Sequence, residues 1–142
     1  MASFYAASYM NCNKTNIFRT ETMKYLSIGL RALLTLAFVG AGFAKLAGAE
    51  MMVVTYDAIG VGQWFRYVTG IIEVGGAALL WLPRRQVLAA SVLGGTMVGA
   101  VLAHLFLLGA AEGIPAVVLG LICTAVIYLH RDQINETLGR TA

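Results

Sequence analysis

Glu73 lies near the middle of the apolar stretch "YVTGIIEVGGAALLWLPRR", residues 67–85. Because a helix rises ~1.5 Å per residue, a side chain about nine positions after Trp64 would lie roughly 13 Å inside this segment. An ionised carboxylate at that depth in an apolar medium needs a partner, since its burial there costs a few kcal/mol or more. Glu73 is therefore the first candidate for a functional or structural polar site.

Three basic side chains are candidate partners of Glu73. At ~100° per residue Arg66 shares its helix face, while Lys45 ends the preceding apolar segment and His104 lies near the end of the following one. The sequence predicts a buried polar cluster of Lys45, Glu73 and His104, with Arg66 at its mouth. A carboxylate and an imidazole can hydrogen-bond a carbonyl ligand or transfer a proton. A structural ion pair, and basic side chains that only snorkel to the headgroups, are open alternatives.

The composition predicts that lipid is the solvent of this chain. Of its 142 residues, 59% are hydrophobic and 12% are charged, and the charged share is about half that of an average soluble domain. A soluble domain of this size must expose much of its surface to water and cannot bury so many apolar residues. The net charge of +3 comes from basic residues scattered between apolar stretches, which predicts no nucleic-acid partner.

Four apolar segments approach the ~20 residues that cross a bilayer as a helix. They cover residues 26–46, 64–82, 87–108 and 114–130. Backbone amides in lipid must be satisfied within the segment, so each segment is predicted to be helical. The predicted fold is all-α, a membrane four-helix bundle in the plasma (inner) membrane.

The basic residues predict the orientation of these spans. Lys45 and Arg66 lie on one side, and the other eight of the ten Lys and Arg lie on the opposite side: Lys14, Arg19, Lys24, Arg31, Arg84, Arg85, Arg131 and Arg140. Because basic residues stay in the cytoplasm, both termini are predicted to be cytoplasmic. We read Arg31, close to a span end, as a side chain that snorkels to the headgroups.

The segments outside the spans have different characters. Residues 1–24 are polar and aperiodic, which predicts a disordered or misassigned extension with Met23 as an alternative start to Met1. Residues 25–131 form the membrane domain, and 132–142 a cytoplasmic tail. Residues 47–63 are too apolar for a solvated loop and predict a short interfacial helix between the first two spans. A cleaved signal over residues 23–49 is an alternative that Lys45 disfavours.

Small residues indicate where helices approach one another. Gly70 and Gly76 share the face of Glu73, and Gly42 precedes Lys45 by three residues. Gly95 and Gly99 form a Gly-x-x-x-Gly pair on the face opposite His104, which predicts contact with another helix or a second copy in a homo-oligomer. The sequence has no metal-ligand cluster, no Cys-x-x-Cys and no Ser, His and Asp set, so we predict no metal site.

The chain resembles the DoxX family, most closely its DoxX-like branch, over about residues 25–131. The resemblance is carried by "AGFAKLAG", "WFRYVTGIIEVGGAALLWLPRR", "MVGAVLAHLF" and "AVVLGLICTAVIYLHR". It implies a four-helix integral membrane protein whose recurring positions correspond to Gly42, Lys45, Gly70, Glu73 and His104. Founding members are described as membrane subunits of a thiosulfate:quinone oxidoreductase, and a distant animal relative is a receptor assembly chaperone. No catalytic role follows for any residue here.

Three functions are compatible with these features. The favoured one is a non-catalytic membrane subunit that binds quinone or another small amphiphile at the polar cluster and associates with a redox enzyme. The second is a structural or assembly protein in which Glu73 only fixes helix register. A small proton or solute transporter is weaker, because four helices without an inverted repeat or a broken helix offer little machinery for alternating access.

Overall fold

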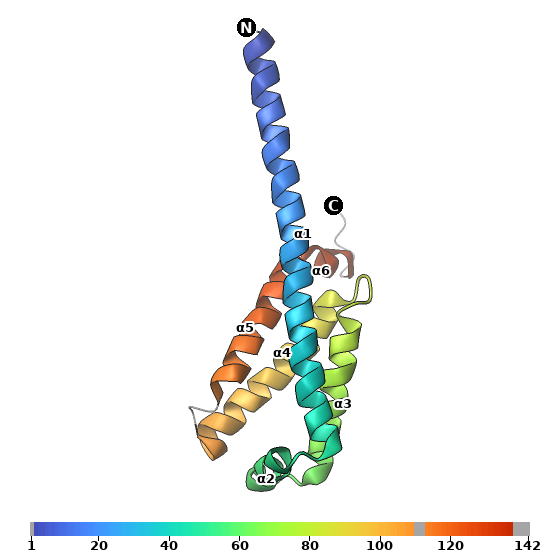
Figure 1. The fold of residues 1–142 in the computed structure, drawn as a ribbon, viewed down its shortest axis with the longest axis vertical. Coiled ribbons are helices and arrows are strands. Elements are labelled where there is room, and N and C mark those ends of the chain that lie inside the picture. The colour runs from blue at the N-terminus through green and yellow to red at the C-terminus, as the bar shows by residue number, and fades with distance from the viewer. Residues whose placement is uncertain (1, 110–112, 138–142) are drawn as a thin grey trace.

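The described part of the chain is helical throughout (Figure 1). The computed structural model describes residues 2–109 and 113–137, with side chains described for 21–109 and 113–134. Its elements are α1 (Ala2–Ala47), α2 (Glu50–Ile59), α3 (Gln63–Leu79), α4 (Gln86–Ala103), the π-helix η1 (His104–Leu108), α5 (Ile114–Leu129) and α6 (Asp132–Thr137). The predicted all-α class is confirmed, since no strand occurs within these ranges.

Glycine and proline set the boundaries of the predicted short helix and its neighbours. Gly48 (φ 74°) turns the chain after α1, and Gly60 (φ 80°) ends α2 in the left-handed conformation that glycine adopts without strain. The helix predicted between the first two spans is therefore present as α2. Pro115 occupies the first turn of α5, where its missing N–H costs nothing.

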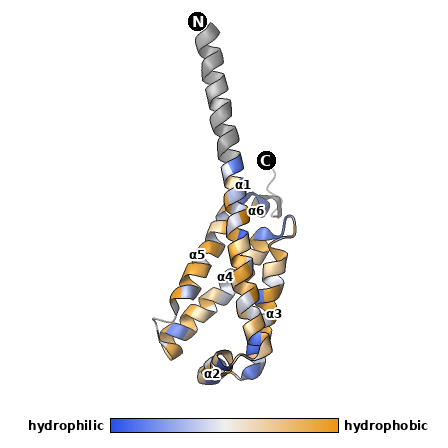
Figure 2. Cartoon of the chain, viewed as in Figure 1, coloured by the Kyte–Doolittle hydropathy of each residue, from blue (hydrophilic) through white to orange (hydrophobic). Residues whose placement is uncertain are grey.

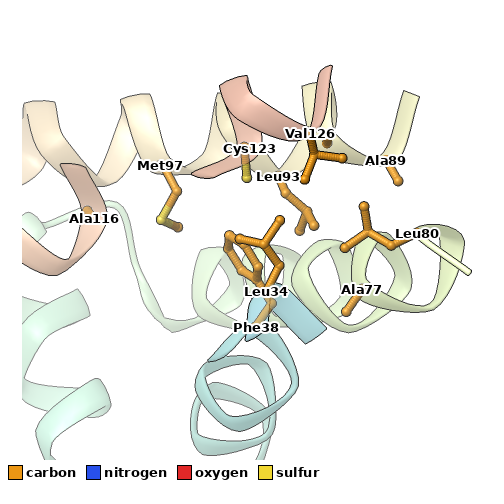
Figure 3. Packing of buried hydrophobic residues seen from close by; sticks show 11 residues of the cluster. Leu34, Phe38, Ala77, Leu80, Ala89, Leu93, Met97, Ala116, Cys123 and Val126 are labelled. Atoms are coloured by element: carbon orange, nitrogen blue, oxygen red, sulfur yellow. The ribbon is translucent and has the colours of Figure 1, made fainter. Parts of the chain in front are cut away.

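Four helices surround one apolar core. α1 packs along α3, α3 on α4, α4 on α5, and α5 returns to α1. Leu34 and Phe38, one turn apart on α1, are fully buried at its centre (Figure 3). The other members of the core are Ala77, Leu80, Ala89, Ala90, Leu93, Met97, Ala116, Cys123 and Val126.

The outward surfaces of these helices are also apolar (Figure 2). Large hydrophobic side chains are exposed on all of them, including Leu36, Ile71, Val98 and Leu121. Two helices, Glu21–Ala47 and Gln86–Leu108, are long and apolar enough to cross a membrane, and only 22% and 11% of their most apolar windows are buried. So little burial is not typical of core helices in a soluble protein.

Helices occupy parts of both terminal segments. α1 begins at Ala2, so a helix runs through a segment that was predicted to be disordered or misassigned. Residues 2–22 contain neither glycine nor proline, and nothing in them interrupts a helix that starts further along. At the other end, α6 occupies part of the predicted tail, where Gln133 hydrogen-bonds Gln86 at the start of α4 (2.7 Å). Met23 as an alternative start to Met1 stays a prediction.

Candidate functional site

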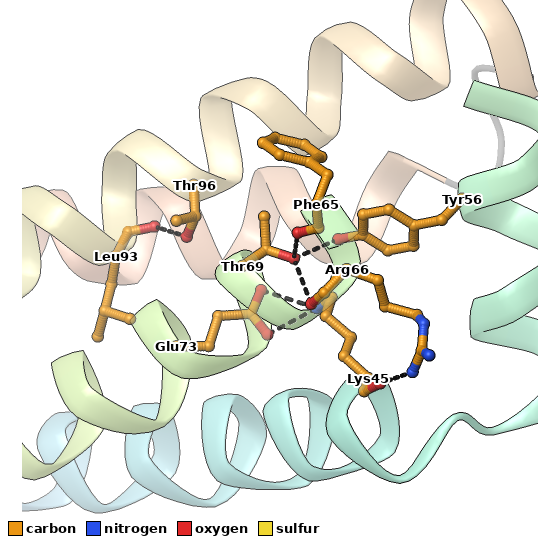
Figure 4. Close-up of polar contacts among 8 residues, drawn as sticks. All are labelled: Lys45, Tyr56, Phe65, Arg66, Thr69, Glu73, Leu93 and Thr96. Atoms are coloured by element: carbon orange, nitrogen blue, oxygen red, sulfur yellow. Dashed lines mark hydrogen bonds and ion pairs between the residues drawn. The ribbon is translucent and has the colours of Figure 1, made fainter. Parts of the chain in front are cut away.

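The centre of the candidate site is an ion pair between α1 and α3. Lys45 Nζ lies 2.6 Å from Glu73 Oε2 and 2.8 Å from Oε1 (Figure 4). The Glu73 side chain is 3% exposed and the Lys45 side chain 12% exposed, so the pair is almost closed to solvent. Lys45 stands in the last turn of α1, where the partial negative charge of the helix end also favours a cation.

Two glycines allow the helices to approach closely enough for this pair. A Cβ on Gly42 would lie 2.7 Å from Val74 Cγ2 and 3.0 Å from the carbonyl oxygen of Gly70. A Cβ on Gly70 would in turn lie 3.1 Å from the carbonyl oxygen of Gly42. The two backbones therefore touch, and Lys45 reaches a carboxylate one turn beyond the contact. This is the arrangement that small residues permit between membrane helices.

Arg66 supports the pair from the side but does not join it. Its guanidinium is buried, donates to the carbonyl oxygen of Lys45 at the end of α1, and donates from Nε to Gln63 Oε1 (2.7 Å). The carbonyl of Lys45 is among the last four of its helix and has no partner within α1; it also accepts from the N–H of Gly48 in the turn that follows (3.3 Å). Arg66 thus caps α1 and holds its end against the start of α3, rather than opening a mouth to solvent.

Tyr56 attaches α2 to the same region and was not identified from the sequence. Its hydroxyl lies 2.6 Å from Thr69 Oγ1, and the ring is buried (Figure 4). Burial raises the pKa of Tyr56 above its ordinary value, and the negative charge of Glu73 adds to the effect. The phenol therefore stays protonated at neutral pH. The only signal in the sequence was Thr69, which shares the face of Glu73.

His104 lies across a cavity from the ion pair and makes no hydrogen bond to it. It begins η1, a form of helix that is rare and often found at functional sites. Its Nδ1 is buried and has no hydrogen-bond partner among the described residues. Gly113, where a Cβ would lie 3.0 Å from His104 Cβ, packs against it. The structure therefore brings Lys45, Glu73 and Arg66 together and leaves His104 on a separate wall.

Lys45 and His104 line the same cavity, of about 460 Å³. Its walls come from the end of α1, from α2, from the α4–η1 junction and from Pro115. Apolar side chains form most of the lining, namely Met51, Met52, Ile59, Ala100, Ala103 and Leu108. Lys45, Tyr56, Thr55 and His104 supply polar atoms. A mainly apolar cavity of a few hundred Å³ with a few polar groups is typical of a site for a small amphiphilic molecule.

Metal binding has no support in the described residues, which contain no group of three His, Cys, Asp or Glu side chains able to hold an ion. A larger hollow of about 540 Å³ lies between α4 and α5, and no charged side chain lines it. That hollow can hold apolar chains but offers no acid or base. The 460 Å³ cavity, in contrast, is lined by both Lys45 and His104.

The remaining predicted packing glycines fall into two groups. A Cβ on Gly76 would lie 2.7 Å from Leu93 Cδ2, so Gly76 permits the contact of α3 with α4. Gly95 and Gly99 are exposed, and a Cβ on either would meet nothing within 4 Å. They leave a smooth strip on α4 that no described residue covers.

Comparison with known proteins adds one match. The model of the DoxX-like family matches residues 29–127, which include Lys45, Arg66, Glu73 and His104. A search of curated proteins and a search of solved structures find no match.

Proposed function

The chain belongs to the DoxX-like family, and on that basis we propose that it is a four-span membrane protein that binds a quinone or a similar amphiphile beside Lys45 and His104. It acts as a non-catalytic subunit and associates with a redox enzyme. The carrying observation is the mainly apolar cavity that Lys45 and His104 line together, with His104 Nδ1 buried and without a hydrogen-bond partner among the described residues.

Four helices are proposed to cross the bilayer with both termini in the cytoplasm. α3 and α5 have 17 and 16 residues, and at ~1.5 Å per residue each approaches the ~30 Å hydrocarbon thickness when its flanking turns are included. Their exposed apolar side chains support lipid contact. The excess of Lys and Arg at one end supports the orientation. α2 then lies at the outer interface.

A quinone suits the cavity because its polar carbonyl groups and its apolar ring and tail need different surroundings. Its carbonyl oxygens accept hydrogen bonds, which His104 and Lys45 can donate, while its ring and tail prefer the methionine and aliphatic walls. Lys45 uses two of its three N–H donors on the carboxylate oxygens of Glu73 and keeps one, while His104 Nδ1 has no hydrogen-bond partner among the described residues. No redox-active residue pair or metal cluster occurs among the described residues, so electrons would come from a partner enzyme.

Replacing His104 by leucine is expected to weaken quinone binding about tenfold, because one hydrogen bond to the ligand is lost while the cavity keeps its size. His104→Gln, which keeps a donor and an acceptor, should recover part of the affinity. Phe106→Leu is the matched control, since Phe106 lies in the same π-helix and is 79% exposed. Affinity is measured by titrating purified protein with decyl-ubiquinone and following tryptophan fluorescence. Equal affinity in wild type and His104→Leu, or no binding to either, would contradict the proposal.

A structural or assembly role is the second candidate, and the ion pair itself favours it. Lys45 and Glu73 pair with each other, and Arg66 bonds Gln63 and the carbonyl oxygen of Lys45, so the three side chains have partners without a ligand. In that case the polar groups fix the register of α1 against α3, and the exposed Gly95 and Gly99 strip receives a client helix or a second copy. Decyl-ubiquinone would then bind neither the wild type nor the variants, while cross-linking from a cysteine placed at Gly99 would capture a neighbouring helix.

A further inference from the structure

Arg31 forms a second polar feature on α1, about four turns before Lys45. It precedes Lys45 by 14 residues, which is roughly 21 Å along a helix axis. Its side chain is partly buried, and its Nε is shielded without a hydrogen-bond partner among the described residues. Among the described side chains, the acidic groups in ion pairs are Glu21, bound to Lys24, and Glu73, bound to Lys45. Arg31 therefore has no ion-pair partner among the described side chains.

Trp81 holds the guanidinium in place. The Arg31 Cζ lies 4.8 Å from the centre of the Trp81 ring, within the range of a cation–π contact. Trp81 Nε1 donates to Thr35 Oγ1 (2.9 Å), and Thr35 Oγ1 donates to the carbonyl oxygen of Arg31 (2.8 Å). The ring is thus tied to α1 one turn from the arginine. A stacked, oriented guanidinium loses little entropy when it binds a planar or tetrahedral oxyanion.

The surroundings of Arg31 are basic on one side and apolar on the other. Trp81 lies in the link from α3 to α4, and that link lies at the same end of the molecule as α6 (Figure 1). Apart from Lys24 and Glu21, which pair with each other, the described charged side chains near this end are four basic ones and one acidic one: Arg31, Arg84, Arg85 and Arg131 against Asp132. Toward the middle of the helices the outer surface exposes large apolar side chains such as Leu33 and Leu36.

We propose that Arg31, stacked on Trp81, binds the phosphate of an anionic phospholipid at the cytoplasmic face of the membrane. Tryptophan prefers the headgroup level of a bilayer, and a guanidinium pairs with two phosphate oxygens at once. The acyl chains lie along the exposed apolar surface of α1 and α3. The excess of basic groups favours a lipid with a net negative charge over a zwitterionic one, whose cationic headgroup would meet further cations.

The test compares lipid retention by wild type and Arg31→Gln. Both proteins are reconstituted into nanodiscs of equimolar phosphatidylglycerol and phosphatidylcholine, released gently, and analysed by native mass spectrometry. Wild type is expected to retain phosphatidylglycerol preferentially, and Arg31→Gln to lower that preference about fivefold. Lys24→Gln removes an exposed charge from the same helix and should leave the preference unchanged within about twofold.

Two further variants keep the test decisive if Arg31→Gln does not fold. Arg31→Lys keeps the charge but loses the planar fork, and Trp81→Leu removes the stacking ring, so each should lower the preference for phosphatidylglycerol. An unchanged preference in all three variants would overturn the proposal. So would an equal Arg31-dependent stabilisation of lipid-depleted protein by inorganic phosphate, which would make this a site for free phosphate.

Discussion

Replacing Lys45 by methionine is expected to lower the free energy of unfolding by about 3–5 kcal/mol, the range found when one partner of a buried ion pair is removed. The reason is Glu73, which is 2% exposed and would be left either charged without a partner or protonated in a site built for a carboxylate. The loss is measured by reversible unfolding in mixed micelles with increasing dodecyl sulfate, followed by far-ultraviolet circular dichroism.

The double variant Lys45→Met/Glu73→Leu distinguishes the net contribution of the ion pair to stability from the penalty for leaving one buried charge unpaired. Removing both charges leaves no unpaired group, so stability should return to within about 1–2 kcal/mol of wild type or exceed it. Lys24→Met is the control, because Lys24 pairs with Glu21 at 3.6 Å on an exposed surface where such pairs contribute little. If Lys45→Met were no more destabilising than Lys24→Met, the buried pair would not be a determinant of the fold.

The sequence contained enough to predict the contact between Lys45 and Glu73. Glu73 had to face protein because of its depth, and Lys45 ended the preceding helix on the same side of the bilayer. The helices within residues 26–130 followed from hydropathy, and α2 followed from apolar residues bounded by glycines. These properties depend on residue type and spacing within a single helix, which is information a sequence holds directly.

The roles of His104 and Arg66 could not be predicted, because they depend on how helix ends meet. The π-helical geometry that begins at His104 is not encoded by a recognisable pattern, and the structure shows no hydrogen bond from His104 to the Lys45–Glu73 pair. Arg66 was expected at a mouth, but the end of α1 offers it a carbonyl oxygen instead. The stacking of Arg31 on Trp81 joins residues 50 positions apart, which no local periodicity reports.

Gly42→Leu is expected to lower the free energy of unfolding by about 3 kcal/mol or more, at the upper end of the cost of overpacking a core. The new side chain would meet Val74 and the carbonyl oxygen of Gly70, and a backbone oxygen cannot move without displacing α3. Displacement of α3 also lengthens the contact of Lys45 with Glu73. The substitution is therefore expected to lower the free energy of unfolding and to break the contact of Lys45 with Glu73 together. The loss of stability is measured by the same unfolding experiment.

Alanine substitutions at Gly40 and Gly42 separate the effect of the contact between α1 and α3 from the effect of helix propensity. Gly40→Ala lies two residues earlier on α1 with nothing within 4 Å, and it should raise stability by about 0.5–1 kcal/mol, because alanine is a better helix former. Gly42→Ala gains the same propensity yet should lower stability by about 1–3 kcal/mol. Adding Val74→Ala removes the 2.7 Å contact but not the carbonyl of Gly70, so recovery should be partial. Equal effects at Gly40 and Gly42 would mean that α1 and α3 do not touch there, and Lys45 would then be too far from α3 to reach Glu73.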